Sequence, residues 1–252
     1  MNTTDLGILI PAFIAGALIL LTHVPLGINV LERGIIFADL AVAQIAGLGV
    51  VAAGLAGYAE QPLIVQLIAA ASALLGAALL SYIEHFLPEV REASIGLLFV
   101  LAASGGILLM SHDTHAGEHL KDLLVGQILW VSNTQLIATA ALTVGILAIR
   151  TLLQKRLGTF GFYALFALSV TASVQLVGVY LVFASLIIPA LATHKLTRNR
   201  TLTAYAVGAS GYAAGLMFSI WLDLPAGAAI VWAMAAMGAT LMLSNSGKIR
   251  NS

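Results

Sequence analysis

Asp39 is the residue of this sequence whose position points most directly to chemistry. It lies a few residues inside Ile35–Gly57, an apolar segment long enough to cross a membrane. A carboxylate within a bilayer is energetically costly, so such a residue normally faces a bundle interior, a partner or an ion path. We therefore predict that Asp39 contacts a passing cation. Two alternatives stay open, in which Asp39 caps its helix at the interface or pairs with Arg33.

The sequence contains no cysteine, so any metal ligand must offer nitrogen or oxygen. Gln44 follows Asp39 in the same apolar segment and is a candidate to line the same cavity with an amide oxygen. A hydrogen bond that merely packs two helices together is the alternative role for Gln44.

A second candidate metal site is a short histidine-rich segment. His112, His115 and His119 are spaced by three and four residues, which places them on one face of a helix. Neutral imidazole binds Zn²⁺ and other transition ions well, and Asp113 and Glu118 add carboxylate oxygens. The segment is predicted to gather metal ions. The alternative is an exposed polar loop without a metal role.

The remaining histidines and a charged turn suggest ordinary structural roles. His23, His85 and His194 fall at the ends of apolar segments, where a polar side-chain tip commonly reaches the interface. The charged residues between Glu84 and Glu92 are expected to form a solvated loop.

The composition indicates what these candidates are embedded in. The 252 residues are 60% hydrophobic and only 9% charged, whereas soluble domains average roughly 45–50% and about 25%. The chain is therefore predicted to be a single membrane domain, 1–252. The N-terminus lacks the basic stretch of a cleaved signal peptide, so its first apolar run is expected to remain as a span.

Several function classes are excluded. The formal net charge is zero and there is no basic tail, which argues against a nucleic-acid partner. No GxxxxGK[ST] phosphate-binding loop is present, so the chain is not expected to hydrolyse ATP or to be an enzyme. No resident cofactor is expected.

Apolar runs separated by short polar breaks predict an all-α polytopic bundle, because only helices or closed barrels satisfy their backbone groups within lipid. We predict nine spans. Eight is the alternative, because the break at Val174–Leu176 is slight and one long broken helix would remove it. The predicted spans are Leu6–Thr22, Ile35–Gly57, Leu63–Tyr82, Ser94–Met110, Gln135–Leu153, Phe160–Val174, Leu176–Ala192, Leu202–Leu222 and Ala226–Leu243.

The basic residues predict the orientation of the bundle. With nine spans, the Lys and Arg clusters at 150–156, 195–200 and 248–250 fall on one side, which is then the cytoplasm. The N-terminus is expected outside and the C-terminus inside. Gly211 and Gly215 form a GxxxG pair, extended by Gly208, which predicts close helix packing within one bundle, with a subunit interface as the alternative.

Four stretches of the chain, taken together in order and spacing, resemble the permease subunits of zinc, manganese and iron uptake ABC transporters. The matching residues are Leu26–Asp39, Ser94–Phe99 with Asp122–Ser132, Val177–Val182 with Leu186–Ala190, and Asp223–Gly227.

The resemblance implies a permease that pairs with a second copy of itself, two cytoplasmic ATPase subunits and an extracytoplasmic metal-binding protein in the bacterial cytoplasmic membrane. It makes Asp39 the carboxylate of the gate. Two departures are visible: Ala43 stands where the family has a histidine, and Arg150–Gly158 replaces a longer segment that touches the ATPase.

The function that we expect is import of a divalent transition-metal ion by alternating access. Zinc is the first choice because imidazole-rich capture suits it, and manganese and iron follow because carboxylate and water suit them. A secondary transporter or channel that works without ATP is the alternative. A membrane protein with a purely structural role is the third hypothesis.

Overall fold

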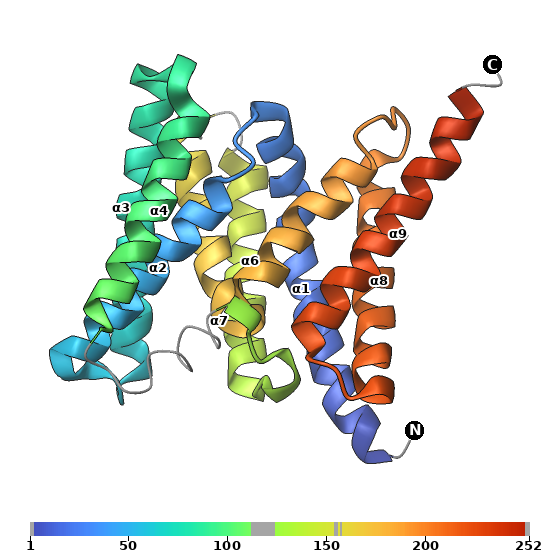
Figure 1. Ribbon diagram of the computed structural model, residues 1–252, viewed down its shortest axis with the longest axis horizontal. Helices are drawn as coiled ribbons and strands as arrows, with labels where there is room; N and C mark the ends of the chain where they lie inside the picture. The colour runs from blue at the N-terminus through green and yellow to red at the C-terminus, as the bar shows by residue number, and fades with distance from the viewer. Residues whose placement is uncertain (1–2, 112–123, 154–155, 157, 250–252) are drawn as a thin grey trace.

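The computed structural model describes residues 3–111, 124–153, 156 and 158–249, and its regular elements over these residues are all helical (Figure 1). The all-α prediction is therefore confirmed. The α-helices are α1 (Thr3–Arg33), α2 (Ala38–Ala53), α3 (Pro62–Phe86), α4 (Arg91–Leu109), α6 (Asn133–Leu153), α7 (Thr159–Ala192), α8 (Arg200–Leu222) and α9 (Ala226–Ile249). Three short segments join them: the π-helix η1 (Gly54–Tyr58) and the 3₁₀ turns η2 (Pro88–Val90) and η3 (Ile128–Trp130).

Helix α7 forms the centre of the bundle. About 72% of the residues in the most apolar 18-residue stretch of α7 are buried, against 11% for the corresponding stretch around α4. Helix α7 therefore belongs to the core, while α4 presents most of its surface outward. Figure 1 shows α2, α3 and α4 on one side of α7, with α1, α8 and α9 on the other. Each of these helices except α4 makes extensive contact with α7.

The number of spans follows the eight-span alternative. Eight helices in the described residues are long and apolar enough to cross a membrane, and the two spans predicted between Phe160 and Ala192 form one of them, α7. The chain remains a multi-pass membrane protein, as predicted. Nine separate helices are not found among the described residues, because no polar loop separates the two halves of α7 and both predicted spans lie in this one helix.

Helix α7 is nevertheless interrupted, at Gly178 rather than at the predicted Val174–Leu176. Gly178 has φ 77° and ψ 164°, a backbone conformation that stops a helix and favours glycine. In Figure 1 the part of α7 before Gly178 runs down the bundle and the part after it runs back up. The two termini consequently lie at opposite ends of the bundle.

The segment of residues 126–132, which contains η3 but no α-helix, packs against this interruption. Gly126 (φ 69°) and Gly178 touch backbone to backbone, and a Cβ atom on either would collide with main-chain atoms of the other segment. The Gln127 N–H also donates to the Leu176 carbonyl at 3.3 Å. This segment therefore packs directly on the position where α7 breaks.

The GxxxG pair packs within the bundle, as predicted. A Cβ atom on Gly211 would lie 2.7 Å from the Met234 Cα atom, and Gly215 faces Ile230, both on α9. Gly208 faces the Leu20 side chain of α1. Small residues on α8 thus let the helix axes approach closely. The resulting van der Waals contacts hold the helices together in lipid, where the hydrophobic effect does not drive helices to associate.

His23 does not lie at an interface, in contrast to the prediction. Helix α1 continues past it to Arg33, and the His23 side chain is fully buried in the bundle. Its Nδ1 atom is 3.2 Å from the Thr22 hydroxyl, which accepts a hydrogen bond from Ser169 of α7 at 2.9 Å. His85 and His194 are exposed at helix ends, as predicted.

Candidate ion-binding site

Asp39 lies in the first turn of α2 and its side chain is almost completely buried, with 1% exposure. One carboxylate oxygen, Oδ1, accepts the Leu40 N–H at 2.8 Å. The other, Oδ2, is buried and has no hydrogen-bond partner among the described residues. A buried polar atom without a partner is rare in folded proteins, and a ligand is one explanation for it.

The alternative in which Arg33 pairs with Asp39 is wrong. The Arg33 guanidinium lies 3.0 Å from one Glu84 oxygen and 3.4 Å from the other, and it stacks over the Phe162 ring at 4.2 Å. Arg91 donates to the Arg33 carbonyl at 2.6 Å. Glu84 and Arg91 thus belong to the packed structure, while residues 85–90 between them are exposed, as expected of a solvated loop.

Glu92 completes this polar cluster at the start of α2. One of its oxygens accepts the Phe37 N–H at 3.4 Å. The helix N-terminus that carries Asp39 is therefore held by α4, while the cations nearby in the sequence are used elsewhere. Asp39 does satisfy a first-turn N–H of its own helix, as the capping alternative expects, but it does so from a buried position.

The residues that accompany Asp39 on α2 offer few further ligands. Ala43 is one helical turn further on and about 40° away around the axis, so it shares the Asp39 face, but its methyl group cannot bind a cation. Gln44 is half-buried and turned about 140° from Asp39. The geometry does not favour the prediction that Gln44 and Asp39 jointly line one cavity.

The histidine-rich candidate cannot be placed. His112, Asp113, His115, Glu118 and His119 lie outside the described residues. Within the described part of the chain, no group of three or more His, Cys, Asp or Glu side chains converges to hold a metal ion. A metal ion at Asp39 would therefore need further ligands from water or from another chain.

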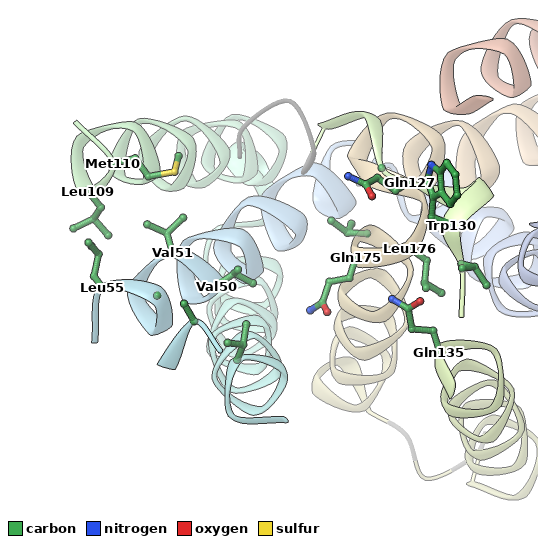
Figure 2. Close-up of a pocket in the computed structure, with 16 residues that line it drawn as sticks. Val50, Val51, Leu55, Leu109, Met110, Gln127, Trp130, Gln135, Gln175 and Leu176 are labelled. Carbon is green, nitrogen blue, oxygen red and sulfur yellow. The ribbon is translucent and has the colours of Figure 1, made fainter. Parts of the chain in front are cut away.

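Sequence reasoning missed a cavity of about 720 Å³ at the other end of α2 (Figure 2). Val50 and Val51 of α2 line it, as do Leu109 at the end of α4 and Met110 directly after it. The opposite wall carries three amide side chains, Gln127, Gln135 and Gln175. Asp39 and Gln44 are not among the lining residues.

The available signal for this cavity was weak. Gln127, Gln135 and Gln175 each fall in or beside a break between apolar runs, and Gln175 precedes a glycine in the longest run. Only the fold brings these three breaks together. The irregular backbone around Gly126 and Gly178 is what the sequence pattern did not reveal.

These features define a class: a multi-pass helical membrane protein with an interrupted central helix and a buried carboxylate at the start of a neighbouring span. The ABC 3 transport family matches residues 5–162 and 153–244 of this chain. The two matches cover nearly the whole sequence, and the chain belongs to this family.

Two curated relatives carry names that mention metals. The manganese transport system membrane protein MntC of Halalkalibacterium halodurans is 29% identical over 174 residues, which cover 60% of each chain. A probable iron transport system membrane protein of Haemophilus influenzae is 26% identical over 168 residues, which cover 58% of this chain and 62% of the relative. This chain thus aligns with only about three-fifths of the length of these relatives.

A solved structure has the same fold. PsaBC from Streptococcus pneumoniae, in complex with a Fab, superposes with a TM-score of 0.74 over 92% of this chain and 89% of that one. The identity is 21%, so the likeness concerns the arrangement of helices.

Proposed function

We propose that this chain is the membrane-spanning permease subunit of an ABC importer that moves a divalent transition-metal ion into a bacterial cytoplasm. The observation that carries the proposal is Asp39, a buried carboxylate inside a span of an ABC 3 family chain, with one oxygen that no described residue partners. A passing cation compensates a charge that the bilayer otherwise penalises. A carboxylate in the path also favours cations over anions.

The chain acts in this proposal as a single membrane domain within a larger assembly. A second copy brings a second Asp39 and so adds oxygen ligands that one copy lacks. Two cytoplasmic ATPase subunits hydrolyse ATP, because this sequence has no phosphate-binding loop. An extracytoplasmic protein delivers the ion to the side where the N-terminus lies, and the assembly sits in the cytoplasmic membrane.

Manganese or ferrous iron is now the preferred cargo over zinc. The relatives are named for manganese and iron. Asp39 offers oxygen, the ligand that manganese prefers, whereas the imidazoles that favoured zinc lie outside the described residues. The zinc preference from the sequence stays an open prediction.

The proposal is tested by uptake into proteoliposomes that contain the chain with its ATPase and binding-protein partners. We expect ATP-dependent uptake of Mn²⁺ or Fe²⁺ and its loss in Asp39→Asn. Asp223→Asn is the matched control, because Asp223 is exposed and has φ 52°, a conformation that asparagine also adopts readily. Normal uptake by Asp39→Asn would refute the role of this carboxylate.

One observation supports a second candidate function. Helix α6 ends at Leu153 and α7 begins at Thr159, so the chain between them is short for a contact with an ATPase. Transport that works without ATP would need no such contact. Uptake that persists in vesicles containing this chain alone would favour a secondary transporter or channel.

A further inference from the structure

The cavity at the far end of α2 is surrounded by irregular backbone. The interruption of α7 at Gly178, the π-helix η1 and the segment that contains η3 all meet there. Non-helical backbone at membrane depth is tolerated only where it is buried in protein or lines a water-filled cavity. The volume of about 720 Å³ has room for about two dozen water molecules at their liquid density. Water is therefore the expected content.

The helix ends around the cavity favour a positive charge. Val174, Gln175 and Leu176, the last turn of the first half of α7, line the cavity, and no lining residue comes from the second half. A helix C-terminus carries roughly half a negative charge, and broken membrane helices use this end to hold cations. Helices α2 and α4 also reach the cavity through residues near their C-termini.

The N-terminus of α6, whose positive end would repel a cation, is already capped by side chains at the cavity. Ser132 and Gln135 cap α6 reciprocally: the Ser132 hydroxyl accepts the Gln135 N–H at 3.2 Å, and Gln135 Oε1 accepts the Ser132 N–H at 2.9 Å. Helix α3 reaches the cavity through Val65, whose N–H donates to the Gln61 carbonyl at 3.1 Å. The positive end of α6 is thus partly satisfied, whereas α3 has no side-chain cap. The carboxyl end of the first half of α7 also lines the cavity, with its Leu176 carbonyl accepting the Gln127 N–H.

The polar side chains that line the cavity are neutral amides, whose oxygen atoms can accept hydrogen bonds. Gln127 and Gln175 make no side-chain hydrogen bond within the described residues, and Figure 2 shows them on the same wall as Gln135, facing aliphatic Val50 and Val51. Among the residues that the structure describes, no charged side chain lines the cavity. Neutral amides can hydrogen-bond to the water shell of an ion without binding the ion so tightly that it cannot leave.

We propose that this cavity is a vestibule that holds a divalent cation with its water shell before the ion reaches Asp39. The inference rests on the proposed transport function. Helix α2 links the two positions, because Val50 and Asp39 lie about 16 Å apart along its axis. The ion keeps its water in the neutral vestibule and exchanges part of it for carboxylate oxygen at Asp39.

The first test asks whether the cavity holds water that is open to the outside. The chain has no cysteine, so Val51→Cys can be labelled selectively in right-side-out vesicles by a membrane-impermeant thiol reagent. We expect rapid labelling that Mn²⁺ slows. Leu75→Cys is the control, because Leu75 is 68% exposed on α3 but does not line the cavity, so lipid should protect it. A Val51→Cys variant that stays unlabelled overturns the proposal, whatever Asp39→Asn does.

The second test measures initial uptake against Mn²⁺ concentration in the full assembly. Gln127→Leu combined with Gln175→Leu removes the two free amides, and we expect KM to rise about tenfold with kcat unchanged, since each lost polar contact to a hydrated ion weakens binding severalfold. Gln66→Leu is the matched control, because Gln66 lies on α3 outside the cavity lining. An unchanged KM in the double variant, while Asp39→Asn abolishes uptake, overturns the vestibule and leaves the proposed function standing.

Discussion

The Arg33 guanidinium lies 3.0 Å from the Glu84 carboxylate, and this ion pair joins the end of α1 to the end of α3. Arg33 is the basic residue that precedes Asp39 most closely in the sequence, and its guanidinium is paired with Glu84. The Asp39 carboxylate is consequently buried without a cationic partner among the described residues. A cation that arrives from elsewhere would meet no competitor at this carboxylate.

The Arg33–Glu84 pair is expected to stabilise the junction between the C-terminal ends of α1 and α3. The two side chains are 34% and 19% exposed, so the pair lies between a surface ion pair and a buried one. We expect Arg33→Met or Glu84→Leu alone to destabilise the fold by about 1–3 kcal/mol, since each leaves a half-buried charge unpaired. The double variant should be more stable than either single variant. Thermal unfolding in detergent measures this cycle, and strictly additive losses would show that the two charges do not interact.

Asp39→Asn is expected to stabilise the empty protein while removing its response to metal. The substitution keeps the shape of the side chain and removes a charge whose Oδ2 atom has no partner in the described residues. Functional sites often exchange stability for activity in this way. Saturating Mn²⁺, at about 100 times its Kd, should stabilise the native protein by about 2.7 kcal/mol and the variant by none. An equal thermal shift in both proteins would place the metal site elsewhere.

Ala43→His should shift ion preference toward zinc. Ala43 lies one turn after Asp39 on the same face of α2, so an imidazole there would stand beside the carboxylate. Imidazole favours Zn²⁺ over Mn²⁺, and the ratio of zinc to manganese uptake is therefore expected to rise. Ala43 is 2% exposed, so the larger side chain also costs about 1–3 kcal/mol of overpacking. Ala43→Leu reproduces the bulk without the ligand, and the same change in ratio from leucine would exclude coordination as its cause.

How much of this protein the sequence predicts depends on the range of the interaction. Spans such as Ala226–Leu243 follow from local hydropathy, and the GxxxG packing follows from residue size, so both were predicted. The break at Gly178 depends on contact with Gly126, which is remote in sequence and packs against it only in the fold. The environment of Asp39 depends likewise on whether Arg33 turns toward it or toward Glu84, and local sequence does not decide this.

Gly178→Ala is expected to prevent the chain from folding normally. An added Cβ atom would meet the backbone of Gly126 and Val125, and φ 77° is itself unfavourable for alanine. Rigid main-chain atoms cannot move aside as a flexible side chain can. We expect a severe loss of folded protein by size-exclusion chromatography. Gly145→Ala in α6 is the control, since nothing lies within 4 Å of its added Cβ atom and alanine favours helix by up to about 1 kcal/mol. Similar yields of the two variants would contradict a tight crossing at Gly178.

The histidine-rich segment that the sequence suggests as a metal site lies outside the described residues. Met110 and Gly126 stand on either side of it in the sequence, and both line the cavity. Weak metal ligands held near the start of a path raise the local ion concentration, and this matters only when the ion is scarce. We therefore expect replacement of His112, His115 and His119 by alanine to lower uptake severalfold at scarce metal and to leave the maximal rate unchanged. Replacing the exposed His85 and His194, which lie near the C-terminal ends of α3 and α7 and do not line the cavity, is the control. A loss that persists at saturating metal would instead indicate that the segment is required for the structure of the permease.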